Sequence, residues 1–220
     1  MKNVIETLKN DPYVNFLPFV GEKYEEGIRG KKILVLGESH YCGDLDCSKC
    51  PKCERANMQP CCRDITKDVM HEYIINYSGE KYEQTFLCFE RAFSGKVLKT
   101  QEEREEFWNH VAFYNYIQNA QSGPRRTPHI ANPEDCAEAF KTILETLMPD
   151  AVIVWGDRLY KVLPDWGGTR SELQLANGDT TPVWTYTIKG KQIPAMAVPH
   201  PSCPRGKNRM RWYAFYEQFI

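Results

Sequence analysis

Four short, continuous apolar runs constrain the fold of this chain more than any other feature. They occupy residues 33–36, 111–114, 151–155 and 195–198. Each run is too short for a typical helix, and its residues are apolar without alternation, which is typical of a strand buried on both faces of a parallel sheet. Helical stretches separate the runs. The sequence therefore predicts an α/β fold, a three-layer αβα sandwich around a four-stranded, mainly parallel sheet.

Helix signals lie between these runs. Asn132 followed by Pro133 and two acids is a strong helix start, because it joins a cap residue, a proline at the first position and favourable charge at the helix dipole. Further helices are predicted over residues 64–77, 101–109 and 157–163, and an edge strand or hairpin over 183–188.

Length and composition indicate one folded unit. The 220 residues fit a single domain over 1–220 with a cysteine-rich insertion at about 42–62. Hydrophobic residues make up 42% and charged residues 26%, as in ordinary globular enzymes. Neither a run of about 18 apolar residues nor an apolar leader segment is found in the sequence, so we expect a cytoplasmic monomer that does not contact membranes.

The charge balance limits any nucleic-acid interface to a small area. The formal net charge is −1, whereas proteins that coat nucleic acid are usually strongly basic. Local basic patches occur at Arg125–Arg126 and over residues 205–211. Charge alone equally allows an ordinary solvated surface.

Six of the nine cysteines fall within residues 42–62. Clustered thiols in a reducing compartment are more often metal ligands than disulfides. The spacing predicts a metal site with ligands among Cys47, Cys50, Cys53, Cys61 and Cys62. The pattern slightly favours zinc, and a 4Fe–4S cluster is the alternative. The same spacing also allows free, reduced thiols that bind no metal.

Polar residues follow the predicted strands at one edge of the sheet. They lie at 37–41, 115–116, 156–157 and 200–202. Ligands of open parallel sheets bind at the carboxyl ends of the strands, so function is expected there.

These segments together resemble the uracil-DNA glycosylase superfamily. ILVLGESHY at 33–41 is similar to the first motif, VAFYNYIQ at 111–118 to the second, and AVPHPS at 197–202 to the last. PDAVIVWGDRLYKVL at 149–163 resembles the third strand and its helix, and FERAFSGKVL at 89–98 is a weaker match to the segment of the stacking aromatic. The resemblance covers most of residues 31–220 in the expected order.

The resemblance implies a DNA glycosylase that hydrolyses the N-glycosidic bond of a deaminated or damaged base. Uracil is the expected base, and the substrate is single- or double-stranded DNA. Asn115 would read the base edge, His200 would stabilise the negative charge of the leaving base, and Glu38 would act on water or the sugar cation. The remaining base-site candidates are Gly37, Ser39, Tyr41 and Phe93. Phosphate contacts are expected from Ser202, Arg205 and Lys207.

The first motif departs from the family pattern. The best-known family has an aspartate where this chain has Ser39, and both related families usually have a proline where His40 stands. Glutamate directly after the glycine, as at Glu38, is closer to the iron–sulfur glycosylases, although their cluster ligands lie elsewhere in the sequence.

Two alternatives stay open. The departures at Ser39 and His40 are compatible with a non-catalytic member of the same fold that binds nucleic acid or a nucleotide. The letters GESH also resemble the motif of erythromycin-esterase-like hydrolases, a reading that leaves Asn115 and the HPS segment unexplained.

Overall fold

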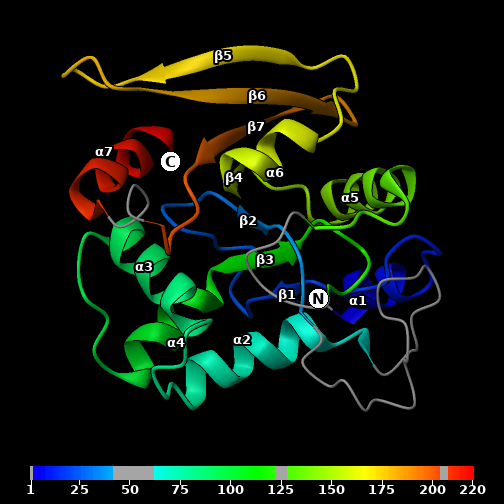
Figure 1. Ribbon diagram of the computed structural model, residues 1–220, viewed down its shortest axis with the longest axis horizontal. Coiled ribbons are helices and arrows are strands. Elements are labelled where there is room, and N and C mark those ends of the chain that lie inside the picture. Colours follow the sequence, from blue (N-terminus) through cyan, green and yellow to red (C-terminus); the bar gives the residue numbers. More distant parts are fainter. Residues whose placement is uncertain (1, 42–61, 122–127, 204–207) are drawn as a thin grey trace.

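A seven-stranded mixed sheet forms the centre of the molecule in a computed structural model, which describes residues 2–41, 62–121, 128–203 and 208–220. The strand order is β1-β3-β2-β4-β7-β6-β5 (Figure 1). The predicted α/β class is confirmed. The prediction of four strands is wrong, because three further strands extend the sheet at its two edges.

The four predicted apolar runs form the four central strands. These are β3 (Val111–Asn115), β2 (Ile33–Gly37), β4 (Ala151–Trp155) and β7 (Lys191–Val198). Each pairs in parallel with its neighbour, and every residue of β2, β3 and β4 is buried. Burial on both faces explains why their sequences are continuously apolar.

The additional strands are antiparallel. β1 (Phe19–Val20) pairs with β3 at one edge, and β6 (Thr180–Ile188) and β5 (Thr169–Gln174) extend the other. Lys189 and Gly190 join β6 to β7 with φ values of +48° and +79°, as a tight primed hairpin turn requires. The predicted strand at 183–188 is therefore part of a longer hairpin strand.

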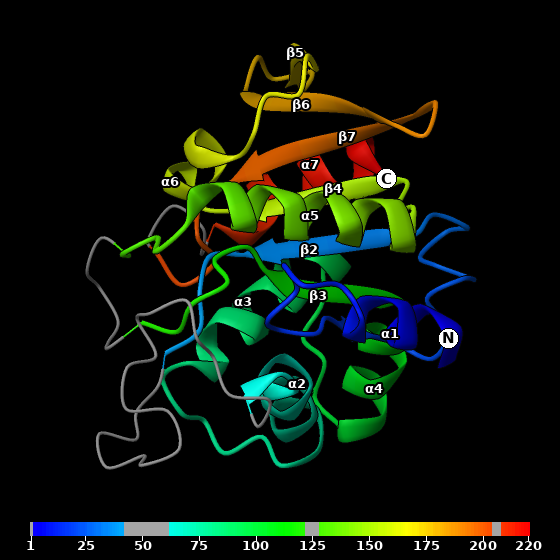
Figure 2. The ribbon, with the colours of Figure 1, turned by 90° about the vertical axis from the view of Figure 1, so that its right-hand side faces the viewer.

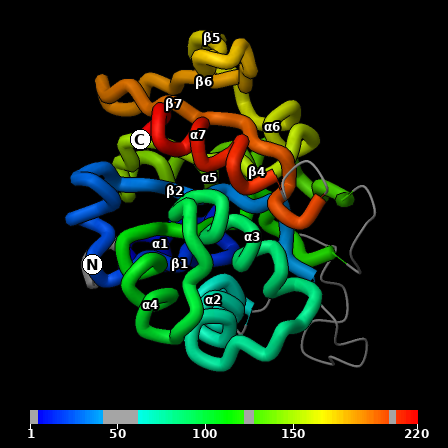
Figure 3. The backbone as a smooth tube through the Cα atoms, turned by 90° about the vertical axis from the view of Figure 1, so that its left-hand side faces the viewer, coloured from blue at the N-terminus to red at the C-terminus, as the bar shows by residue number. Residues whose placement is uncertain are grey.

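Helices cover both faces of the sheet, so the molecule has three layers (Figures 2 and 3). One face carries α1 (Lys2–Lys9), α5 (Pro133–Leu147) and α6 (Asp157–Val162). The other carries α2 (Ile65–Ile75), α3 (Glu83–Ser94), α4 (Gln101–Asn109) and α7 (Arg209–Phe219). No helix in the described part of the chain is long and apolar enough to span a bilayer.

The helix starts follow their local sequence. Asn132 caps α5 by accepting bonds from the N–H groups of Glu134 and Asp135, at 3.1 and 3.3 Å, as predicted. Thr100 begins α4 with a capping box completed by Glu103. The sequence did not predict the helices α3 and α7. Arg209 and Arg211 of the basic stretch lie in the first turn of α7.

A carboxylic acid lies inside the helical layer formed by α3 and α4. Glu90 is fully buried, and its Oε2 accepts a bond from Trp108 Nε1 at 3.2 Å. Burial raises the pKa of Glu90 from 4.5 to about 7, against the opposing effects of Tyr73, Trp108 and Arg104. The folded state therefore keeps a proton that the unfolded chain loses above pH 4.5.

Replacing Glu90 with Gln should remove a pH-dependent loss of stability. As pH rises from about 4.5 through 7, the native protein binds more protons than the unfolded chain, so its free energy of unfolding falls. A shift of this size corresponds to at most about 3 kcal/mol. Urea unfolding of both proteins between pH 4.5 and 8 should show this decline in the wild type and a flatter profile in Glu90→Gln; parallel profiles would contradict the assignment.

Candidate active site at the carboxyl edge of the sheet

The close approach of Gly37 and Asn115 defines the centre of the site. These residues are register partners at the ends of β2 and β3. A Cβ atom at position 37 would lie 2.2 Å from Oδ1 of Asn115 and 3.0 Å from Cζ of Phe113. Only glycine leaves room for the Asn115 carboxamide in this position, which explains the glycine that ends the first apolar run.

The loops after β2 and β3 continue side by side beyond the strands. The N–H groups of Tyr116 and Ile117 donate to the carbonyl oxygens of Gly37 and Glu38, at 3.0 and 2.9 Å. Further on, the N–H of Gln121 donates to the carbonyl of His40 at 2.8 Å. This backbone pairing fixes the residues that follow Gly37 against the loop that follows Asn115.

His40 and Asn115 form a buried polar contact. Their exposed fractions are 5% and 6%, and Nδ2 of Asn115 lies 3.2 Å from Nδ1 and 3.1 Å from Nε2 of His40. Nε2 of His40 also bonds to Oγ1 of Thr66 at 2.9 Å, and Phe16 packs edge-on against the imidazole. Burial lowers the pKa of His40 from 6.5 to about 3, so the ring is neutral at physiological pH.

Glu38 is held by an arginine that sequence reasoning missed. Arg158, in the first turn of α6, binds the carboxylate through two nitrogens; Nε lies 2.6 Å from Oε1, and an Nη group bonds to Oε2. The Glu38 side chain is 13% exposed and that of Arg158 49%. The signal for Arg158 was its place two residues after Gly156, because Gly156 follows β4 at the same edge and turns the chain into α6 with φ +105°.

His200 reaches the same edge from the end of β7. Its Cβ lies 3.9 Å from where a Cβ on Gly156 would stand, and its ring lies edge-on to Trp155. Nδ1 bonds to Ser202 Oγ at 2.8 Å. The side chain is exposed, yet the surrounding protein removes enough water to lower its pKa, against the opposing charge of Glu38.

Glu38, Asn115 and His200 thus come to one edge from three separate strands. Asn115 contacts Gly37, the neighbour of Glu38, and the charge of Glu38 acts on His200. Ser39, which lies between Glu38 and His40 in the sequence, has a buried Oγ with no hydrogen-bond partner among the described residues. Such an unpaired hydroxyl can bond to a ligand.

Two further candidates lie in different surroundings. Tyr41 is 45% exposed and bridges to Gln121, so its ring is accessible at the rim. Phe93 is 7% exposed and packs between Phe107 and Tyr216, at centroid distances of 5.6 and 5.0 Å. Its ring belongs to the hydrophobic core, and we do not include it in the site.

Several predicted residues lie outside the described part of the chain. These are the phosphate candidates Arg205 and Lys207, the basic pair Arg125–Arg126 and the cysteines Cys47, Cys50, Cys53 and Cys61. Cys62 is described and is half-buried. Within the described ranges, no cluster of three or more His, Cys, Asp or Glu side chains is arranged to hold a metal ion.

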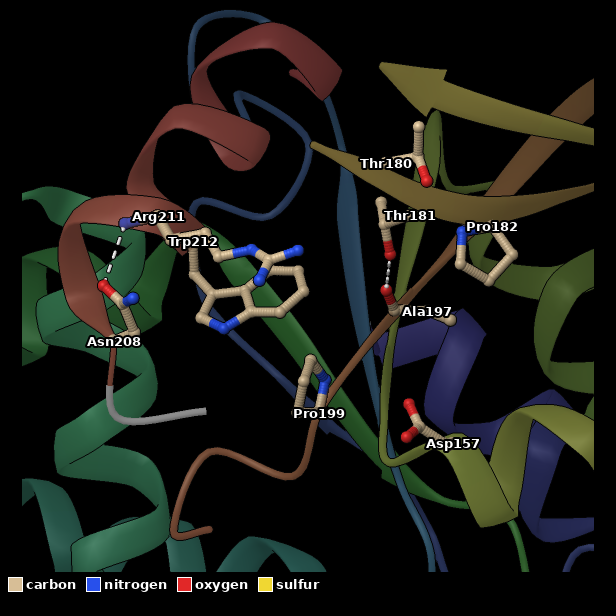
Figure 4. Close-up of a pocket in the computed structure, with 9 residues that line it drawn as sticks. All are labelled: Asp157, Thr180, Thr181, Pro182, Ala197, Pro199, Asn208, Arg211 and Trp212. Carbon is tan, nitrogen blue, oxygen red and sulfur yellow. Dashed lines mark hydrogen bonds between the residues drawn. The ribbon is translucent and has the colours of Figure 1, made fainter. Parts of the chain in front are cut away.

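A cavity of about 410 Å³ borders the site (Figure 4). It lies between the end of β7, the start of β6 and the first turn of α7, with Asp157 and Arg211 among its lining residues. Its wall includes Pro199, the neighbour of His200, but not Glu38, Asn115 or His200 themselves.

No model of a known protein family matches this sequence, and no curated protein matches it significantly.

The contact between Gly37 and Asn115 predicts a strong energetic coupling. Gly37→Ala should destabilise the protein by about 1–3 kcal/mol, because the new methyl group overlaps the Asn115 carboxamide. In an Asn115→Ala background the same change should cost much less, leaving mainly the contact with Phe113. Urea unfolding of the four proteins gives the coupling energy. Equal costs in both backgrounds would show that the carboxamide does not occupy this space.

Proposed function

We propose that this protein is a DNA glycosylase that removes a deaminated or damaged base by hydrolysing its N-glycosidic bond. Uracil is the base that we expect it to remove. The observation that carries the proposal is the meeting of Glu38, Asn115 and His200 at the carboxyl edge of the sheet. Base excision needs a group that reads the extruded base, a group that stabilises the leaving anion and a carboxylate near the sugar. The three side chains supply one each.

His200 is suited to the leaving base. The backbone N–H of Ser202 points at Nδ1 from 3.4 Å, and the Ser202 hydroxyl lies 2.8 Å from the same nitrogen. If Nδ1 accepts these contacts, the proton of the neutral ring resides on Nε2. Partial desolvation lowers the pKa of His200 and keeps the ring neutral near pH 7, so Nε2–H would donate to the negative charge that forms on the departing base.

Asn115 is suited to the base edge. A carboxamide carries a donor and an acceptor side by side, which matches the alternating groups of a pyrimidine or purine edge. Its burial and its contacts with Gly37 and His40 restrict its rotation. A restricted carboxamide would lose little conformational entropy when a base binds.

Glu38 would stabilise the positive charge that develops on the sugar or orient the attacking water. Arg158 holds both carboxylate oxygens, so its guanidinium would set the direction of Glu38 and compete with the sugar for its charge. This engagement also favours the second candidate function, a non-catalytic DNA-binding protein of the same fold, because a fully paired carboxylate has less capacity for chemistry.

The DNA backbone would be held at the rim of the site. Ser202 stands next to His200 there, and Arg205 and Lys207 follow it in the sequence. Basic side chains in this position would bind phosphates and make binding weaker at high salt.

Single-site variants test the proposed chemistry. His200→Ala should slow excision of uracil from an oligonucleotide by about a hundred- to a thousandfold, the usual effect of removing one such electrostatic contact, with DNA affinity largely kept. Asn115→Ala should remove the hydrogen bonds by which the site recognises the base edge. Thr142→Val is the control, since Thr142 on α5 donates its hydroxyl to Asp11, and neither residue is a candidate site residue.

Three outcomes separate the candidates. Full activity of His200→Ala would remove His200 from the mechanism. A wild-type protein that binds DNA but excises none of uracil, hypoxanthine or xanthine would support the non-catalytic function. A protein that neither binds DNA nor excises a base would overturn both.

We also propose that cysteines from Cys47 to Cys62 bind one zinc ion or one 4Fe–4S cluster. The support is their spacing in the sequence, where short CxxC turns bring two thiolates to one metal. Elemental analysis of the purified protein should give about one zinc per chain or several irons with visible charge-transfer absorption. Stable, metal-free protein whose clustered thiols all react with an alkylating reagent would contradict the proposal.

A further inference from the structure

The residue that faces the Asn115 carboxamide is a buried histidine. Nδ2 of Asn115 lies almost equally far from the two ring nitrogens of His40, at 3.2 and 3.1 Å. The amide nitrogen of Asn115 therefore faces the imidazole of His40, and the carboxamide oxygen lies next to Gly37. The contact is shielded from water, because both side chains are buried.

The charge state of His40 favours one direction of the carboxamide. A neutral imidazole carries one N–H donor and one lone pair. When Nε2–H donates to Oγ1 of Thr66, the lone pair of Nδ1 faces Asn115, where it attracts an N–H group and repels a carbonyl oxygen. Turning the Asn115 carboxamide by 180° would place Oδ1 against this lone pair and Nδ2 against the backbone of Gly37. In a site without water the two directions differ in energy more than they would in solvent.

Thr66 fixes His40 in turn. Oγ1 of Thr66 lies 2.9 Å from Nε2 of His40, and Thr66 is fully buried in the first turn of α2. Phe16 packs edge-on against the same ring with a centroid distance of 4.7 Å. Together these contacts prevent the imidazole from turning away from Asn115.

We infer that His40, held by Thr66, is a positioning residue that fixes the direction of the Asn115 carboxamide and so selects the base edge that the site accepts. The inference rests on the proposed function. With its direction fixed, Asn115 offers an acceptor on the Gly37 side and a donor on the His40 side. Uracil presents a ring N–H beside a carbonyl, whereas cytosine presents a ring nitrogen acceptor beside an amino donor, the reverse order.

Selectivity between these two bases tests the inference. The wild type should excise uracil in strong preference to cytosine from otherwise identical oligonucleotides. Thr66→Val, which keeps the shape of the side chain but removes the hydroxyl, should lower this preference by about tenfold or more, and His40→Phe should lower it further. Thr142→Val, which also removes one hydroxyl bond, should leave the preference unchanged.

A readout that does not need activity separates this inference from the proposed function. Nuclear Overhauser effects between the Asn115 side-chain NH₂ and the His40 ring protons should be present in the wild type and weaker in Thr66→Val. If the wild type excises no base, the proposed function and the selectivity fail together, while these NMR signals still decide whether His40 orients Asn115. Absence of the signals in the wild type, or unchanged signals and preference in Thr66→Val, would overturn the inference.

Discussion

The site depends on one steric condition, the absence of a side chain at Gly37. The parallel pairing of β2 with β3 brings position 37 directly opposite Asn115, and Oδ1 of Asn115 takes the space in which a Cβ would stand. The backbone pairing of the two following loops then places Glu38 and His40 relative to Asn115. Buried strands fix this arrangement, so the polar residues at the edge rest on a rigid support.

The interior of the sheet could be predicted from the sequence, and its edges could not. Strands buried on both faces must be continuously apolar, which is why residues 33–36, 111–114 and 151–155 were identified with nearly correct bounds. β5 has the sequence TRSELQ and is almost entirely exposed, so it carries no apolar signal. β1 has only two residues, and pairing with β3 rather than its own composition makes it a strand.

The sequence indicated which residues belong to the candidate site, but not the contacts that these residues make. Motif position identified Glu38, Asn115 and His200, because strand order brings the ends of parallel strands to one edge. The ion pair with Arg158 depends on how α6 starts after Gly156, and the burial of Phe93 depends on the packing of α3 against α4 and α7. Such contacts between distant elements leave no trace in local sequence patterns.

A structure of the protein with duplex DNA that contains 2′-fluoro-2′-deoxyuridine tests the central claim most directly, because the fluorine destabilises the sugar cation and slows bond cleavage. We predict that the uracil lies outside the base stack with its edge against Asn115, His200 beside the base and Glu38 on the side of the sugar. A uracil that stays stacked in the duplex, or DNA bound away from the carboxyl edge of the sheet, would contradict the proposed glycosylase site.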